Sequence, residues 1–283
     1  MNERIAADAY CKLLASRHYE NFIVAGPLVS PDLRIHLRRL YAFCRTTDDL
    51  GDESGDVALT RLARWRDEVA ALFAGAAPVH PVLIALRETI GQCALPAQPF
   101  LDLIEANVAD QTVKSYETWA QLLGYCMLSA APVGRLVLRI FGIYNAHTEK
   151  LSDDVCIGLQ LANHAQDVTR DRAIGRTYLL QSDIRTSGIA GAVRALCDRA
   201  IVLLRSGREL EAVAPYALRL QLALYRLGGL AICRRIAALD YRTDLRRPSV
   251  SGARRWAVFM QAAVQSLHPL KGPGSAEAVG SHR

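Results

Sequence analysis

Residues 41–53 read Tyr-Ala-Phe-Cys-Arg-Thr-Thr-Asp-Asp-Leu-Gly-Asp-Glu, and this stretch sits in a segment with the pattern of a helix. On a helix, residues three and four apart share a face, so Tyr41, Arg45, Asp48 and Asp52 lie along one stripe. Like charges at that spacing cost an isolated helix roughly a few tenths of a kcal/mol, and Gly51 costs about 1 kcal/mol relative to Ala. A stretch that breaks local rules in this way usually serves something other than stability.

A second polar stretch follows much later in the chain, inside a segment that the pattern predicts to be one long helix over 148–172. Its polar residues recur at intervals of three and four, which places them on one continuous stripe, while most of their neighbours are apolar. Such a stripe is expected to line a polar cavity within a helical bundle. The stripe consists of Gln160, Asn163, Asp167 and Asp171, while Gln166 lies beside it and Arg176 and Tyr178 follow the helix.

The two aspartate pairs suggest a metal-assisted reaction on a diphosphate. Carboxylates on two facing helices would repel one another without cations between them. Mg²⁺ takes one or two carboxylates and completes its shell with water and phosphate oxygens, so two to three ions could hold a diphosphate there. Arg45 and Arg176 could bind its oxygens bidentately. Metals and arginines together would stabilise the departing diphosphate and leave a carbocation behind. Asp49 and Glu53 lie about 100° away from the stripe and rank second.

The alternative for each pair alone is a helix cap or a solvated face. Both pairs arising by chance, each with Arg, Asn, Gln or Tyr on the same stripe, is the less favoured interpretation. Taken singly, His18 is more often a structural histidine, and Tyr41 and Tyr125 could be core residues with satisfied hydroxyl groups.

The whole chain reads as one all-α domain. Its 283 residues are 51% hydrophobic and 22% charged, enough for a sizeable core and too apolar for disorder. No alternating strand pattern bounded by turn residues is present. We expect a domain over 1–268 and a disordered Gly/Ser-rich tail over 269–283. The expected helices cover about 4–17, 32–53, 57–75, 82–93, 99–110, 116–128, 129–141, 148–172, 187–213, 215–240 and 250–267.

Charge and cysteine usage bound the partners and the compartment. The net charge of +6 suits anionic partners such as diphosphates or acidic lipid surfaces. It also permits nucleic acid, but the basic residues are dispersed and no binding motif is present, so none is expected. The seven cysteines form no CxxC pair, which favours free thiols in a reducing cytoplasm. We expect neither a signal peptide nor a transmembrane helix, and peripheral membrane contact is left open.

Two motifs together carry a family resemblance. YAFCRTTDDLGDE at 41–53 and NHAQDVTRDRAIGRTYL at 163–179 resemble the squalene/phytoene synthase family of head-to-head prenyl synthases. The resemblance spans about residues 10–265. HYENF at 18–22 and the segment 116–142 look most like the hopanoid-pathway branch called HpnC, described as hydroxysqualene synthase.

The resemblance implies an isoprenoid-synthase helical bundle around a central cavity, with Mg²⁺ as cofactor. It implies metal binding by Asp48, Asp52, Asp167 and Asp171. Diphosphate would be helped by Tyr41, Arg45 and Arg176, and Tyr125 would line the cavity near the cation. Substrate contacts would further involve His18, Asn163, Gln166, Tyr178 and Tyr241, the last closing over the diphosphate.

For this branch the implied substrate is presqualene diphosphate, whose rearranged cation is captured by water. No GxGxxG motif is present, so no nicotinamide cofactor is expected. One alternative is condensation of two farnesyl or geranylgeranyl diphosphates to presqualene diphosphate, squalene or phytoene. Another is a non-catalytic assembly or partner subunit, which the presence of all four aspartates disfavours. The sequence leaves open whether a sister synthase is a partner.

Overall fold

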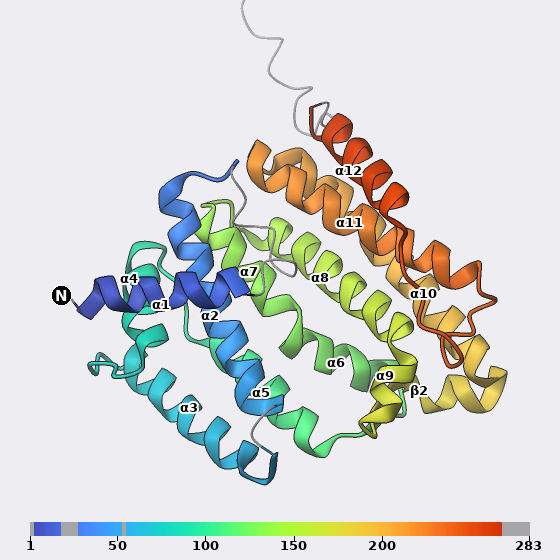
Figure 1. Ribbon diagram of the computed structural model, residues 1–283, viewed down its shortest axis with the longest axis horizontal. Coiled ribbons are helices and arrows are strands. Elements are labelled where there is room, and N and C mark those ends of the chain that lie inside the picture. The colour runs from blue at the N-terminus through green and yellow to red at the C-terminus, as the bar shows by residue number, and fades with distance from the viewer. Residues whose placement is uncertain (1–2, 18–27, 53–54, 268–283) are drawn as a thin grey trace, which may run out of the picture.

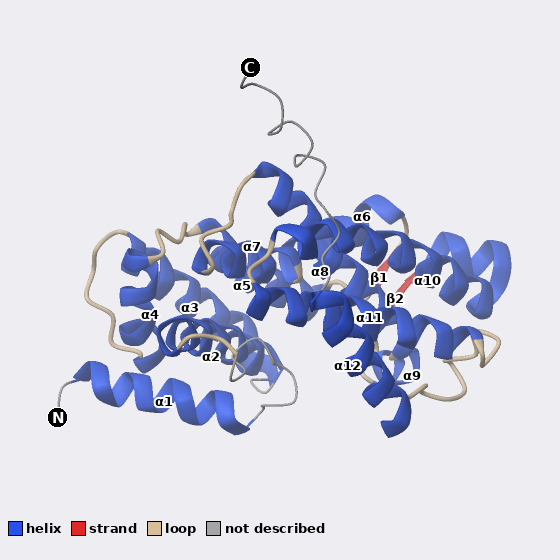
Figure 2. Ribbon diagram, turned by 90° about the horizontal axis from the view of Figure 1, so that it is seen from above, coloured by secondary structure: helices blue, strands red, loops and turns tan. Residues whose placement is uncertain are grey.

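In the computed structural model, which describes residues 3–17, 28–52 and 55–267, the chain is a bundle of helices with one small pair of strands (Figure 1, Figure 2). The all-α fold class predicted from the sequence is confirmed. The helices are α1 (Glu3–Arg17), α2 (Pro31–Asp52), the 3₁₀ helix η3 (Gly55–Val57), α3 (Ala58–Phe73), α4 (Pro81–Gln92), α5 (Gln98–Thr112), α6 (Trp119–Ser129), α7 (Ala131–Ile140), α8 (Ala146–Gln166), α9 (Val168–Ala173), α10 (Gln181–Val213), α11 (Tyr216–Ala237) and α12 (Gly252–Leu267).

Local capping signals set several helix starts. The Thr118 hydroxyl accepts a hydrogen bond from the backbone N–H of Gln121, and the Gln121 side-chain oxygen accepts one from the backbone N–H of Thr118. This capping box opens α6. Asn145 and Thr148 form the same arrangement at the start of α8. α2 and α4 begin with a proline, which needs no hydrogen-bond partner in the first turn.

The helix expected over 148–172 is interrupted, which corrects the sequence prediction. α8 ends at Gln166, and Asp167 has φ −100° and ψ 17°, outside helical values. The six-residue α9 follows and ends before Gly175, whose φ of 73° is left-handed. The polar stripe is therefore split between two helices, and Asp171 points from α9 rather than from α8.

The expectation that the chain has no strand is also wrong. β1 (Ser115–Tyr116) and β2 (Thr177–Leu180) pair in parallel, and the amide of Thr177 donates to the carbonyl of Lys114 at 2.9 Å. The strands have two and four residues, which is too few for an alternating pattern, so no periodicity in the sequence predicts them. Because of β1, α6 starts at Trp119 rather than at 116. α10 starts at Gln181 rather than at 187 and is kinked at Gly188.

Two large hydrophobic clusters build the core, and α5 contributes to both. Phe100 and Ile104 lie in the cluster formed with α2, α3 and α4, while Ala106 lies in the cluster formed with α6, α8 and α10. Helices in the second cluster approach closely. A Cβ on Gly158 of α8 would lie 2.9 Å from Leu204 Cγ of α10.

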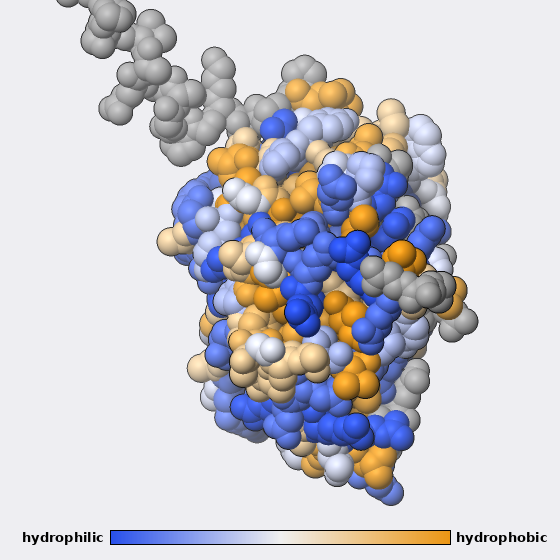
Figure 3. Space-filling view, turned by 90° about the vertical axis from the view of Figure 1, so that its left-hand side faces the viewer, coloured by the Kyte–Doolittle hydropathy of each residue, from blue (hydrophilic) through white to orange (hydrophobic). Residues whose placement is uncertain are grey.

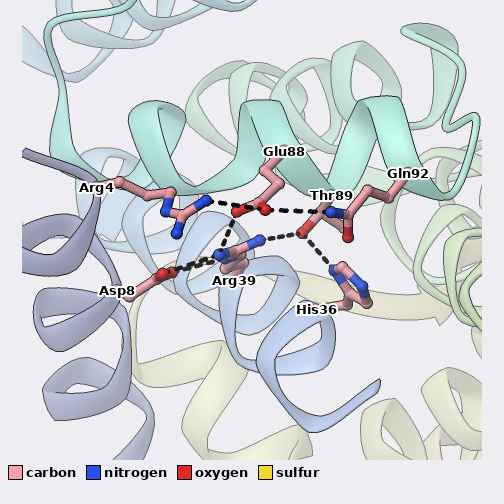
Figure 4. Close-up of polar contacts among 7 residues, drawn as sticks. All are labelled: Arg4, Asp8, His36, Arg39, Glu88, Thr89 and Gln92. Carbon is pink, nitrogen blue, oxygen red and sulfur yellow. Dashed lines mark hydrogen bonds and ion pairs between the residues drawn. The ribbon is translucent and has the colours of Figure 1, made fainter. Parts of the chain in front are cut away.

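A buried arginine ties α1 to the rest of the bundle (Figure 4). Arg39 of α2 donates to both carboxylate oxygens of Asp8 on α1, at 2.7 and 2.9 Å, and to Glu88 of α4 at 2.9 Å. Its side chain is only 5% exposed, so this charge depends on those two carboxylates. Thr89 completes the network with hydrogen bonds to Arg39 and His36.

One described segment, 119–140, is long and apolar enough to pass a composition test for a membrane-crossing helix. In the structure it is two helices, α6 and α7, which meet at Ala130. Leu122, Cys126 and Leu136 from this segment are core residues with no exposed surface. Its apolar composition is therefore explained by packing within the bundle.

Candidate active site

Asp110, near the end of α5, is the meeting point of three polar side chains from other parts of the chain. The Tyr125 hydroxyl of α6 donates to Asp110 Oδ2 at 3.0 Å, and the Tyr178 hydroxyl of β2 donates to Oδ1 at 3.0 Å. Arg176 Nη1 lies 3.7 Å from Oδ2. The side chains of Asp110 and Arg176 are 17% and 15% exposed, so the charge pair is largely removed from water.

The strand pair explains why these residues meet. β1 begins five residues after Asp110, and β2 begins directly after Arg176. The parallel pairing of Ser115 with Thr177 brings both segments to the same edge. The left-handed turn at Gly175 ends α9, and Arg176 then leads into the strand at Thr177. The two strands absent from the sequence prediction thus position the polar centre of the site.

The charges of both predicted aspartate segments influence pKa values at this polar centre. Burial raises the pKa of Asp110, Arg176 lowers it, and the carboxylate of Asp52 raises it again. Burial raises the pKa of Asp171 to about 6, helped by Asp167, while Arg176 opposes the shift. Asp52 of α2 and Asp171 of α9 therefore influence one buried ion pair, and their joint role in metal binding stays a prediction.

Asp48 is accessible to water yet surrounded by protein atoms, and burial raises its pKa to about 6. Asn107 Nδ2 of α5 donates to Asp48 Oδ1 at 3.4 Å. The glycine that seemed costly for a helix has a packing reason. A Cβ on Gly51 would lie 2.6 Å from Asn107 Oδ1, and Gln111 donates to the Gly51 carbonyl at 3.2 Å. Gly51 therefore lets α5 approach the acidic stripe of α2.

Arg45 forms an ion pair with Asp49, the acidic residue that the helical stripe ranked second. The two residues are four positions apart on one helix, a spacing at which side chains commonly meet. Tyr41 is buried in α2, and desolvation raises the pKa of its hydroxyl while Arg45 lowers it. Tyr41 and Arg45 are thus neighbours, and their contribution to diphosphate binding stays a prediction.

The segment after α11 covers the second aspartate stretch. Arg247 forms a two-point ion pair with Asp167, one contact being Nη2 to Oδ2 at 3.3 Å. Gln166, which is 9% exposed, donates to the carbonyl of Pro248 at 2.9 Å. Gln166 therefore braces the chain at Pro248, and Arg247 is a site residue that the sequence prediction did not include.

The remaining predicted residues have varied positions. Asn163 is exposed on α8, one turn before Asp167. Tyr241 has a left-handed φ of 60°, and its ring lies 5.8 Å from the Arg194 guanidinium. Its closure over a diphosphate stays a prediction. His18 lies outside the described residues, as do Glu53 and the 269–283 tail.

Stacked aromatic rings form a wall beside Asp110. Tyr116, Tyr125 and Tyr178 have ring centroids 5.5 to 5.8 Å apart. His164 stacks on Tyr178 at 3.7 Å, and burial lowers its pKa to about 3. Within the described part of the chain, His164 Nε2 has no hydrogen-bond partner.

Sequence reasoning missed Asn107, Asp110, Tyr116, His164 and Arg247. A usable signal existed for the first two. Asn107 lies three residues before Asp110 and four before Gln111, so the three share one face of the helix, which is the same polar-stripe pattern that identified the aspartate segments.

The residues that could hold a metal ion are the four predicted aspartates. Among residues 3–17, 28–52 and 55–267, no three acidic, His or Cys side chains are arranged to hold an ion by themselves. The chemistry of the donors nevertheless fits Mg²⁺, which binds few carboxylates and keeps positions for water and phosphate oxygens. Burial is the main cause of the raised pKa values of Asp48 and Asp171, and the neighbouring carboxylates Asp52 and Asp167 add to it, a like-charge contribution that a bound cation would offset.

Comparison with known proteins extends this picture. The family described as squalene/phytoene synthase matches residues 15–254. A hydroxysqualene synthase from Rhodopseudomonas palustris is 31% identical over 240 residues, covering 78% of this chain and 80% of that protein. Phytoene synthase 3 from Zea mays is 28% identical over 93% of this chain and 66% of that protein.

Solved structures agree. The crystal structure of squalene synthase HpnC from Alicyclobacillus acidocaldarius is 42% identical, with a TM-score of 0.80 over 85% of this chain and 97% of that one. A dehydrosqualene synthase in complex with a ligand superposes with a TM-score of 0.81 over 93% of this chain and 97% of that one. At 22% identity, the second likeness concerns the fold alone.

Proposed function

Because the chain belongs to the squalene/phytoene synthase family, we propose that it converts presqualene diphosphate to hydroxysqualene and diphosphate with Mg²⁺ as cofactor. The family acts on prenyl diphosphates. The choice of substrate within it is supported by the relatives named hydroxysqualene synthase, at 31% identity.

A single observation carries the proposal. The buried Asp110–Arg176 pair is influenced by the charges of both Asp52 and Asp171, and Tyr125 and Tyr178, which donate to Asp110, belong to a cluster of tyrosine rings. Charged groups that could hold a diphosphate and its metal ions, close to aromatic rings, suit a substrate that carries a diphosphate on a long hydrocarbon.

The reaction begins when the C–O bond to diphosphate breaks and its electron pair leaves with the diphosphate. Arg176 and Arg45 would bind the diphosphate oxygens, and Asp48, Asp52, Asp167 and Asp171 would hold Mg²⁺. Bound Mg²⁺ supplies further positive charge for the leaving group. Asp110 fixes the orientation of Arg176 through their ion pair.

The aromatic wall serves the cation that remains. The faces of Tyr116, Tyr125 and Tyr178 attract positive charge through their ring quadrupoles. Because the hydroxyls of Tyr125 and Tyr178 donate to Asp110, their oxygen lone pairs stay available to accept hydrogen bonds from water. A water oriented in this way would donate a lone pair to the rearranged cation, and its proton would pass to the released diphosphate.

The test is incubation of purified protein with Mg²⁺ and each candidate substrate, with products identified by mass. We expect hydroxysqualene from presqualene diphosphate, without a nicotinamide cofactor. Chelation of divalent ions is expected to abolish turnover, and added Mg²⁺ to restore it. Asp171→Asn is expected to lose turnover, while Asp198→Asn, on the exposed face of α10, keeps it.

The second candidate is head-to-head condensation, which the solved relative titled squalene synthase and the phytoene synthase relatives favour. Product from farnesyl or geranylgeranyl diphosphate alone would establish it and reject the hydroxysqualene proposal. A well-folded protein that converts none of the three diphosphates would instead point to a non-catalytic partner subunit. A sister synthase that supplies presqualene diphosphate stays a prediction.

A further inference from the structure

Helix α12 carries an apolar face that the described chain leaves uncovered. Figure 1 shows α12 at the edge of the bundle, beside α11. Its large side chains on the solvent side recur every three or four residues and are strongly exposed. We call this set the outer face of α12: Trp256 (65%), Phe259 (46%), Met260 (43%), Val264 (58%) and Leu267 (63%).

The opposite side of α12 packs against α11, so the outer face is not the side of the helix that contributes to the core. Val258, Ala262 and Ala263 pack against Leu220, Ala223 and Leu227 of α11. Gln265 accepts hydrogen bonds from Arg208 at 2.9 Å and Arg226 at 2.8 Å, and both arginines also bind the buried Glu211. The helix is therefore held in a fixed rotation.

A basic pocket lies at the start of the same helix. It has a volume of about 410 Å³ and is lined by Arg234 and Arg235 of α11, by Arg254 of α12 and by the hydroxyl-bearing Ser249 and Ser251. No acidic residue lines it. In the described part of the chain, the three guanidinium groups make no ion pair. The backbone amides at the start of α12 add to the preference for an anion.

From these two features we propose that the outer face of α12 and the basic pocket dock this protein onto a bilayer containing anionic phospholipids. Helices that lie in a membrane interface typically have Trp, Phe and other apolar side chains on one face and basic residues nearby. The pocket would receive a lipid phosphate while the outer face enters the acyl boundary. This proposal is independent of which prenyl diphosphate the enzyme converts.

Charge and composition favour a bilayer over two other occupants. From Leu245 to Leu267 the chain has four arginines and no acidic residue. A symmetric contact with a second copy would bring two such basic surfaces together, which charge repulsion opposes. The tail sequence from 268 to 283 offers only Leu270 and Val279 as branched apolar side chains, too few to cover five large ones.

The opposite end of the molecule differs (Figure 3). On that side, where α1 and α4 lie, hydrophobic and hydrophilic residues are interspersed over the surface. Exposed Ile5 and Leu13 of α1 share their helix with charged residues such as Arg4, Asp8 and Lys12. By contrast, the charges of α12 are confined to Arg254 and Arg255 at its start, which leaves the outer face continuous.

The experiment measures binding of the full chain to vesicles of phosphatidylcholine with and without about 30% phosphatidylglycerol, by flotation. We expect binding to the anionic vesicles that weakens as salt is raised, because salt screens the arginines. Trp256 fluorescence is expected to shift to the blue on binding, and Trp256→Phe to remove that shift. The other two tryptophans, the buried Trp65 and the half-buried Trp119, lie outside α12 and contribute the background.

Two variants test the two features separately. The double variant W256S/M260S is expected to lower the partition coefficient about tenfold or more, and R235Q/R254Q about three- to tenfold on anionic vesicles only. The matched controls are Val202→Ser, 67% exposed on α10, and Arg205→Gln on the same helix, both expected to bind as the original chain does. Circular dichroism melts confirm that each variant is folded.

Several results would overturn the proposal. They are no binding to either vesicle, equal binding to neutral and anionic vesicles, or unchanged binding by the two double variants. A dimer in light scattering that W256S/M260S dissociates, together with no vesicle binding, would assign the outer face to a second copy instead.

Discussion

Asp110 is the residue on which the polar centre of the site depends, because it binds two tyrosines and an arginine at once. Asp110→Asn keeps the shape and one acceptor oxygen but removes the charge that holds Arg176. Charge-assisted hydrogen bonds contribute about 1.5–3 kcal/mol, so we expect kcat/KM to fall about 10- to 100-fold. Steady-state kinetics on the preferred diphosphate measures this.

Asp102→Asn is the control for that variant, since Asp102 lies on the same helix and only accepts a hydrogen bond from Gln98. A kcat/KM for Asp110→Asn within twofold of the original would show that Asp110 is not a positioning residue for Arg176.

His164 makes stability depend on pH. Burial lowers its pKa to about 3, whereas an unfolded histidine titrates near 6.5. As the pH falls below 6.5 the unfolded chain takes up this proton first, so the free energy of unfolding decreases by up to about 1.4 kcal/mol per pH unit until the folded group titrates.

We therefore expect the original chain to lose about 2 kcal/mol more than His164→Phe between pH 6.5 and 5, measured by urea unfolding. Phenylalanine keeps a ring against Tyr178 and cannot titrate. Parallel pH profiles for the two proteins would contradict this explanation.

At the scale of elements, α8 and α10 approach each other closely at Gly158. Gly158→Ala would place its Cβ 2.9 Å from Leu204 Cγ and 3.1 Å from the Leu204 backbone nitrogen. Because a backbone cannot yield as a flexible side chain does, we expect a loss of about 1–3 kcal/mol in the free energy of unfolding.

Gly124→Ala is its counterpart on α6, where a Cβ meets nothing within 4 Å. Helix propensity alone then applies, and we expect a gain of up to about 1 kcal/mol. Equal effects of the two substitutions in chemical denaturation would show that the α8–α10 contact is not tight.

The elements that the sequence predicted well are those fixed by local pattern. The stripe of α2 and the apolar spacing of α3 follow from residues within one helix, and both helices form nearly where expected. The break at Asp167 and the strand pair depend on contacts with residues distant in the chain, such as Arg247 and Lys114. No local period encodes such contacts.

At the scale of the whole molecule, the candidate site lies between the two hydrophobic clusters. α2, with Asp48 and Asp52, packs in the first cluster, while β2 and the residues around α9 pack in the second. A ligand held by both aspartate segments would therefore join the two clusters and stabilise the folded state by mass action.

We expect Mg²⁺ and inorganic diphosphate together to raise the melting temperature on the order of 5 °C at about 100 times the dissociation constant, and either alone to do less. Differential scanning fluorimetry measures this. Asp52→Asn and Asp171→Asn are expected to lose the shift, and a chelator to reverse it. An unchanged melting temperature with both ligands present would contradict a shared site.

The short strand pair has a consequence for the order in which the protein acquires its active form. Ser115 and Thr177 are 62 positions apart (177 − 115), so their pairing closes a long loop. That closure has an entropic cost, which the local contacts within the intervening helices avoid. α5 and α8 can form from local contacts, but Asp110 and Arg176 meet only after that closure. A chain that is still being synthesised would thus form helices well before its active site is assembled. Catalytic activity would be among the last properties that the folding protein acquires.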